Sequence, residues 1–203
     1  MKQVTGSNTP QATNKVSIQL TLDGHSFSAH GLDGEFPGEE PVEAELLTAR
    51  TMLVPEEVLG TGDAGTLLAA NGMAPAAEER AVCSLPVQGI VAVMAAHREA
   101  LRQAEEKLGD RILYTTPLFR EVQAGTPTVW AYRTAGLLYI KVYDGILRFA
   151  GVIPAPDTAD VCYFTERLGK EFALKSCELR ISGDDAKACG KLLKGYFKRI
   201  VCE

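Results

Sequence analysis

Two stretches of alternating apolar and polar residues predict β-hairpins. The first, VSIQLTL at 16–22, runs into Asp23-Gly24, and the second, LLYIKVY at 137–143, runs into Asp144-Gly145. An Asp-Gly pair between alternating segments favours a tight turn, because both residues tolerate positive φ. VWAYRTA before the second stretch and ILRFAGVI after it extend that hairpin into three consecutive antiparallel strands.

Apolar residues at helical spacing predict helices between and after these strands. The stretch HREALRQAEEKLG at 97–109 has an apolar stripe and a terminating glycine. A later helix begins after Asp157 or Thr158, either of which can cap it. The last helix begins at Asp184 or Asp185, and its expected apolar face consists of Cys189, Leu192, Leu193, Tyr196, Phe197 and Ile200.

The stretch EVQAGTP at 121–127 divides the chain. We expect a flexible leader at 1–15, a first lobe at 16–122 and a second lobe at 127–203. An offset of 121 residues, the difference between positions 144 and 23, superimposes the two Asp-Gly turns. Because strands and helices follow in a similar order in each half, the pattern predicts an internal duplication of a βββαβα unit.

This order of elements resembles the ribonuclease H-like unit, duplicated as in the actin-like ATPases. The segments that carry the resemblance are VSIQLTLDGHSFSA, TARTMLVPEEVL and the run from LLYIKVYDGILRFAGVIPA through ELRISGDD. They are similar to an uncharacterised bacterial family with that architecture, akin to the actin-like proteins of type IV pili and cell division. The resemblance implies an α/β fold with two ribonuclease H-like lobes, each a mixed sheet with flanking helices.

The resemblance also implies where a nucleotide would bind. In the actin-like superfamily the first hairpin of each lobe holds phosphates, and a strand–Gly-Gly–helix motif holds the adenosine. Asp23-Gly24 and Asp144-Gly145 stand at the two hairpin positions, and Ser182-Gly183 stands at the third. A working ATPase or kinase-like protein would bind ATP and Mg²⁺ there, with Asp23 or Asp144 positioning the metal and the attacking water.

Departures from the family pattern argue against a working site. Both hairpins have Asp-Gly where the family has Asp-x-Gly, and no hydroxyl residue directly follows the second. Asp184 replaces the glycine that would let a ribose approach the backbone. Asp184 and Asp185 also place negative charge at a helix N-terminus, which otherwise favours an anion. We therefore interpret the turns as structural and SGDD as a strand-to-helix turn with an N-cap, with a surviving nucleotide site as the alternative.

Composition limits the remaining classes of function. The net charge of −5 and the pI near 5.3 disfavour a general nucleic-acid binder. The polar start of the chain lacks a secretory signal, and no apolar run is long enough for a membrane span. The five cysteines form no C-x-x-C pair, so we expect reduced thiols, no zinc site and a cytoplasmic location.

One charged feature suggests a binding surface. Lys187, Lys191, Lys194 and Lys198 recur on one face of the last expected helix. Such a face is usually only solvated, but it could also attract an acidic partner. No independent catalytic set is evident, so we expect no cofactor and a protein-interaction or scaffolding module with an unidentified protein partner. The alternative is a nucleotide-binding ATPase or kinase-like protein.

Overall fold

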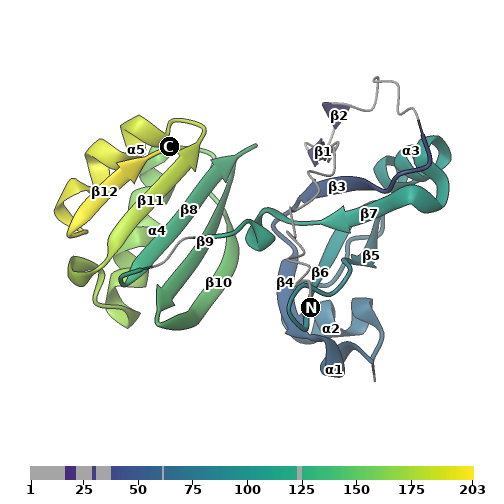
Figure 1. The fold of residues 1–203 in the computed structure, drawn as a ribbon, viewed down its shortest axis with the longest axis horizontal. Coiled ribbons are helices and arrows are strands. Elements are labelled where there is room, and N and C mark those ends of the chain that lie inside the picture. Colours follow the sequence, from purple (N-terminus) through teal and green to yellow (C-terminus); the bar gives the residue numbers. More distant parts are fainter. Residues whose placement is uncertain (1–16, 22–28, 31–37, 61, 123–124) are drawn as a thin grey trace, which may run out of the picture.

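The computed structural model describes residues 17–21, 29–30, 38–60, 62–122 and 125–203, arranged as an N-terminal and a C-terminal part (Figure 1). Both parts combine β-sheets with flanking helices. The chain is therefore a mixed α/β protein, as the sequence predicts. Asp23 and Gly24, two residues of the predicted nucleotide site, lie outside the described residues.

The N-terminal part contains two sheets. The first has the order β2-β1-β3-β7, in which β1 is antiparallel to β2 and parallel to β3, and β3 is parallel to β7. The second sheet, of order β4-β6-β5, is inserted in the chain between β3 and β7. The strands are β1 (Ser17–Thr21), β2 (Ala29–His30), β3 (Val42–Leu47), β4 (Thr51–Pro55), β5 (Glu79–Cys83), β6 (Ile90–His97) and β7 (Ile112–Thr115).

Three helices accompany these sheets, namely α1 (Glu56–Leu59), α2 (Ala64–Ala70) and α3 (Arg98–Leu108). The apolar stripe of α3 predicted from the sequence is buried against β3 and β6, with Leu101 and Ala104 fully enclosed. Gly109 ends this helix with φ of 57°, a conformation that glycine adopts without strain. The predicted helix and its stop signal are confirmed.

The C-terminal part is one five-stranded sheet of order β10-β9-β8-β11-β12. Strands β8, β9 and β10 form the antiparallel meander predicted from the sequence. Strand β11 lies between β8 and β12 and is parallel to both. The elements are β8 (Thr128–Thr134), β9 (Leu137–Asp144), β10 (Ile146–Pro154), α4 (Thr158–Glu171), β11 (Glu178–Gly183), α5 (Ala186–Leu192) and β12 (Arg199–Cys202).

Helices α4 and α5 share one apolar core with a face of this sheet. Val129, Ile140 and Leu179 contribute from the strands, and Val161 and Cys189 contribute from the helices. The start of α4 is fixed by a capping box. In this box the Asp157 carboxylate accepts from two backbone N–H groups of the first turn, so the predicted cap is confirmed.

The last helix is shorter than the sequence predicts. Helix α5 ends at Leu192, a single 3₁₀ turn follows at Leu193–Gly195, and the chain then forms strand β12. Ile200 pairs with Leu179 in the sheet, and Leu192 is 53% exposed. Gly195 disfavours a continued helix, and an apolar residue at helical spacing can equally cover the core from a strand.

Strand pairing contradicts the offset of 121 residues. That offset places β1 on β9, but β9 pairs antiparallel with both of its neighbours. Strand β8 is the one that pairs like β1, antiparallel to the next strand in the chain and parallel to a later one. The offset therefore matches strands that occupy different places in their sheets.

The second face of the C-terminal sheet meets the N-terminal part at the connector that follows β7. Leu47, Leu118, Trp130 and Tyr139 form an apolar cluster there. Arg120 makes a two-pronged ion pair with Glu45, at 3.0 and 2.7 Å. The same guanidinium lies 3.9 Å from the ring centre of Tyr132. Charge, hydrogen bonding and apolar packing thus act together at this junction.

Lys141 occupies the centre of the junction and is only 2% exposed. Its ammonium donates to the backbone carbonyl oxygens of Leu118, at 3.0 Å, and Arg120. It also lies 4.6 Å from the ring centre of Trp130, within the range of a cation–π contact. Burial, with a smaller contribution from the Arg120 charge, lowers the pKa of Lys141 to about 8.

The low pKa of Lys141 predicts a pH-dependent stability. Between about pH 8 and pH 10 the unfolded chain keeps this proton while the folded protein has released it. The free energy of unfolding should therefore rise with pH, by at most about 1.4 kcal/mol per pH unit, relative to a Lys141→Met variant in which other titrations cancel. Urea denaturation of both proteins across this range measures the difference. A difference that does not change with pH would contradict the assignment.

Candidate functional site

The carboxyl ends of β8 and β11 meet at one edge of the C-terminal sheet. Arg133 on β8 is paired with Gly183 on β11. The chain leaves β8 through a tight turn in which Ala135 and Gly136 both have positive φ, 50° and 69°. In open sheets that contain parallel strands, the carboxyl end is the usual place for ligands, so this edge is the first candidate site.

Gly183 lies where two backbones approach closely. Its φ is 87°, and a Cβ added to it would lie 2.0 Å from the backbone oxygen of Arg133. The next residue, Asp184, donates its N–H to that same oxygen at 2.8 Å. The glycine of Ser182-Gly183 is therefore explained by contact between β11 and β8.

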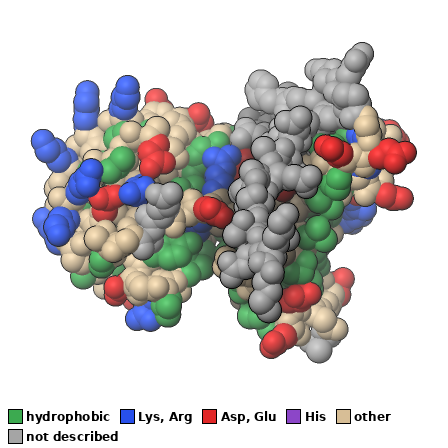
Figure 2. Space-filling view, in the orientation of Figure 1, with side chains coloured by type: hydrophobic (Ala, Val, Ile, Leu, Met, Phe, Trp, Pro, Cys, Tyr) green, Lys and Arg blue, Asp and Glu red, His purple; other side chains and the backbone are tan. Residues whose placement is uncertain are grey.

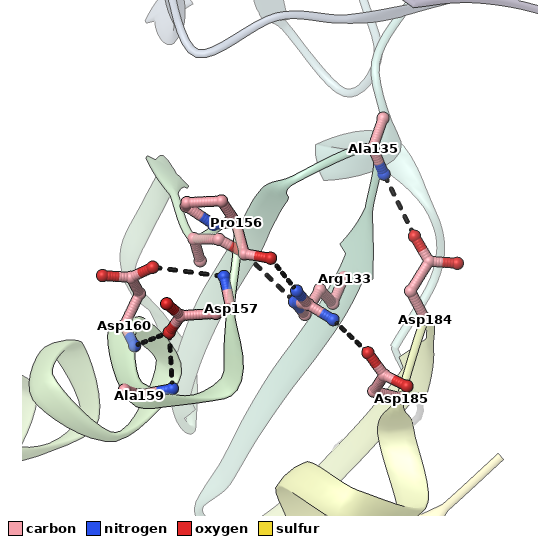
Figure 3. A network of polar contacts seen from close by, with 9 residues as sticks. Arg133, Ala135, Pro156, Asp157, Ala159, Asp160, Asp184 and Asp185 are labelled. Atoms are coloured by element: carbon pink, nitrogen blue, oxygen red, sulfur yellow. Dashed lines mark hydrogen bonds and ion pairs between the residues drawn. The ribbon is translucent and has the colours of Figure 1, made fainter.

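The two aspartates after Gly183 turn toward β8 (Figure 3). The carboxylate of Asp184 accepts a hydrogen bond from the N–H of Ala135 at 3.1 Å, at the tight turn. The carboxylate of Asp185 pairs with Arg133 at 2.8 Å. Arg133 is 5% exposed and also donates to the carbonyl oxygens of Ala155, at 3.1 Å, and Pro156, at 2.5 Å. The edge is thus held by a connected polar network.

This network corrects the predicted N-cap. Asp185 stands at the N-cap position of α5, but its φ is 54° and its side chain makes no capping hydrogen bond. The Asp185 carboxylate pairs instead with the buried guanidinium of Arg133, an interaction in which both partners are charged. The Asp184 side chain also bonds outside the helix. The aspartates therefore join strands and turns instead of capping the helix.

The predicted nucleotide residues do not come together in the described part of the chain. Asp144-Gly145 lies at the turn between β9 and β10, near Thr128, where β8 begins. Gly183 lies where β8 ends, at the opposite end of the strand. The sequence predicts a turn at Gly136, but neither this turn nor Arg133 was predicted as part of a site, although an arginine inside the apolar strand VWAYRTA is an available signal.

The four predicted lysines do come together. Lys187 and Lys191 project from α5, while Lys194 and Lys198 follow in the segment that leads to β12, and all four are exposed. Together with Arg199 they line a shallow pocket with a volume of about 510 Å³. Basic side chains gather over this outer end of the C-terminal part (Figure 2). The rest of its lining consists of Gly190, Phe197, Ile200 and Cys202. We call this surface the α5–β12 groove.

Four of the cysteines show no sign of activation. Burial is the largest cause of a raised pKa at Cys83, Cys162, Cys177 and Cys189. A thiol with a raised pKa stays protonated near neutral pH and is a poor nucleophile or metal ligand. Among the described residues, no group of three or more His, Cys, Asp or Glu side chains is arranged to hold a metal ion.

The arrangement of sheets and helices is that of the actin-like ATPase fold. A Bacteroides thetaiotaomicron protein described as having an actin-like ATPase fold and unknown function superposes with a TM-score of 0.73 and 15% identity, over 93% of this chain and 90% of that one. The predicted resemblance to uncharacterised proteins of actin-like architecture is thus confirmed at the level of the fold.

A second solved structure matches more weakly. It is the cytoplasmic domain of EpsL, an inner membrane component of the type II secretion system of Vibrio cholerae, with a TM-score of 0.44, 9% identity, and coverage of 81% of this chain and 80% of that one. No protein-family model and no curated protein matches the sequence. Of the helices that the structure describes, none is both long and apolar enough to cross a membrane.

Proposed function

We propose that this protein is a non-catalytic protein-interaction module built on the actin-like fold. The observation that carries the proposal is the hydrogen bond from the N–H of Ala135 to the carboxylate of Asp184. In this fold, turns at such sheet edges bind phosphates through their backbone N–H groups. Here the protein's own carboxylate takes the place that a phosphate oxygen would need.

The strand pairing supports this assignment of the turn. Because β1 and β8 pair alike, we infer that the two parts are duplicates and that the β8–β9 turn corresponds to the β1–β2 turn. The second phosphate position is then Ala135-Gly136, and not Asp144-Gly145. Two carboxylates beside that turn, Asp184 and Asp185, would repel a polyphosphate.

The alternative is an ATP-binding protein. One observation favours it: Arg133 is a cation beside the same turn, and it could exchange Asp185 for a phosphate. That exchange would also have to move the Asp184 carboxylate away from Ala135. ATP and Mg²⁺ would then bind at this turn and, as the family resemblance implies, at Asp23-Gly24.

Calorimetric titration with ATP and Mg²⁺ separates the two functions. We expect no binding heat at ATP concentrations up to about 1 mM, because the Asp184 carboxylate occupies the Ala135 N–H and two carboxylates repel the phosphates. A Kd weaker than about 1 mM corresponds to less than about 4 kcal/mol of binding energy. Asp184→Ala frees the Ala135 N–H and removes one negative charge, so this variant should be the first to bind detectably.

Glu57→Ala, on exposed α1, is the control for loss of one acidic residue. The alternative would be established if the unmodified protein bound ATP with a micromolar Kd, if Asp23→Ala weakened this binding, and if Glu57→Ala left it unchanged. Asp144→Ala tests the position matched in sequence. It should have no effect on any ATP binding if the second phosphate turn is Ala135-Gly136.

A further inference from the structure

The α5–β12 groove combines a cationic rim with an apolar floor. Between Lys187 and Arg199 the chain carries five basic residues and no acidic one, although the whole chain has a net charge of −5. Phe197 is 7% exposed and lies in the floor with Ile200 and Gly190. Within the described part of the chain, none of the four lysines of the rim makes an ion pair. Arg199 pairs with Glu178 at 3.4 Å, so the four lysines carry the local excess of positive charge.

One wall of this groove is an open edge of the sheet. Strand β12 pairs with β11 on one side and is the last strand of its sheet among the described residues. The N–H of Glu203 is bonded to the oxygen of Ile181 at 3.0 Å, toward β11, in register with the pairing of β11 and β12. Because successive peptide groups of a strand point to opposite sides, the N–H and C=O groups of Ile200 and Cys202 point toward the open edge.

We propose that the α5–β12 groove binds an extended acidic peptide segment of a protein partner, which adds to the sheet as a strand beside β12. The proposal rests on the proposed interaction function and names its surface and the chemistry of the partner. Backbone hydrogen bonds to Ile200 and Cys202 supply the pairing. Carboxylates at every second position, turned toward α5, meet Lys187, Lys191 and their neighbours.

The shape of the surface favours a peptide over the other anionic partners. A lipid surface or a nucleic-acid duplex fits a convex or flat cationic face, whereas here the lysines surround a hollow with apolar residues beneath them. Neither of those partners uses the unpaired backbone of β12. A strand with alternating acidic and apolar residues uses the rim and the backbone edge together.

The first experiment measures peptide binding by fluorescence anisotropy. The probe is a labelled peptide of about seven residues in which Glu and Val alternate, the length of a typical strand. The controls are a peptide of equal composition with Glu and Val in separate blocks, and the alternating peptide N-methylated at the amides that would face β12. Because the controls alter only the probe, the fold of the protein is not at risk.

We expect the alternating peptide to bind at least about ten-fold more tightly than either control, and to weaken as salt rises from about 50 to 300 mM. Lys191→Glu together with Lys194→Glu should weaken binding by about ten-fold or more. Arg167→Glu together with Lys170→Glu, at exposed positions of α4, is the matched charge control and should have no effect.

Equal binding of the alternating and the N-methylated peptide would overturn strand addition. The choice of partner would be overturned if single-stranded DNA or phosphatidylserine vesicles bound more tightly than the peptide. It would also be overturned if the protein self-associated in a salt-dependent way and the two lysine substitutions abolished that association. The ATP titration reports on the Ala135-Gly136 turn, which is not part of the lining of the groove. A failure of the groove is therefore distinguishable from a failure of the proposed function.

Discussion

Replacing Gly183 with alanine is expected to lower the free energy of unfolding by about 3 kcal/mol or more, since both strain at positive φ and steric overlap contribute. The added Cβ would lie 2.0 Å from the backbone oxygen of Arg133, and the φ of 87° is unfavourable for any side chain. The neighbouring atom is backbone within a paired strand, so it has little freedom to move. Urea denaturation monitored by circular dichroism measures the loss.

Gly145→Ala is the matched control for this substitution. Gly145 has a similar φ of 73°, but nothing lies within 4 Å of the position of the added Cβ. The cost there should be limited to backbone strain of about 1 kcal/mol. Equal losses for the two variants would mean that β11 does not approach β8 as closely as described.

Replacing Arg133 with methionine is expected to cost about 3–5 kcal/mol of stability, because each carbonyl oxygen that loses its charged donor costs about 1–3 kcal/mol. The substitution would leave the carbonyl oxygens of Ala155 and Pro156 without their donor. Methionine retains much of the side-chain volume, so the loss reports on polar contacts more than on a cavity.

Asp185→Asn separates the ion pair from the rest of the network. The Asp185 side chain is 63% exposed, so losing its charge should cost about 1 kcal/mol or less. Thermal or urea denaturation of both variants gives the comparison. If Asp185→Asn is as costly as Arg133→Met, the carbonyl contacts of Arg133 are not the main contribution.

The sequence predicts the elements of this fold where local patterns agree with tertiary contacts. The strands β8, β9 and β10 and the helices α3 and α4 combine periodicity, turn residues and caps, and all five were predicted. Strand β12 was missed because Ile200 fits both the apolar face of a helix and a strand over the same core. Local periodicity does not distinguish the two when a glycine such as Gly195 interrupts the segment.

The candidate site was harder to predict because pairing decides it. Asp23-Gly24 and Asp144-Gly145 match in sequence, yet the strand that pairs like β1 is β8. The residues that define the edge, Arg133 and Ala135, gain their roles from contacts with residues far along the chain. The separations are 22, 23 and 52 positions for Arg133 and 49 positions for Ala135. The lysines of the groove were found because four of them recur within one short segment.

The junction around Lys141 also gives the protein a built-in optical probe. Trp130 is the single tryptophan of the chain, and it is 6% exposed with the Lys141 ammonium 4.6 Å from its ring centre. Indole emission is sensitive to nearby charge and to water. Selective excitation of this residue therefore reports on the connector between the two parts. A rearrangement of the parts on ligand binding would change the wavelength or the intensity of the Trp130 fluorescence, without an added label.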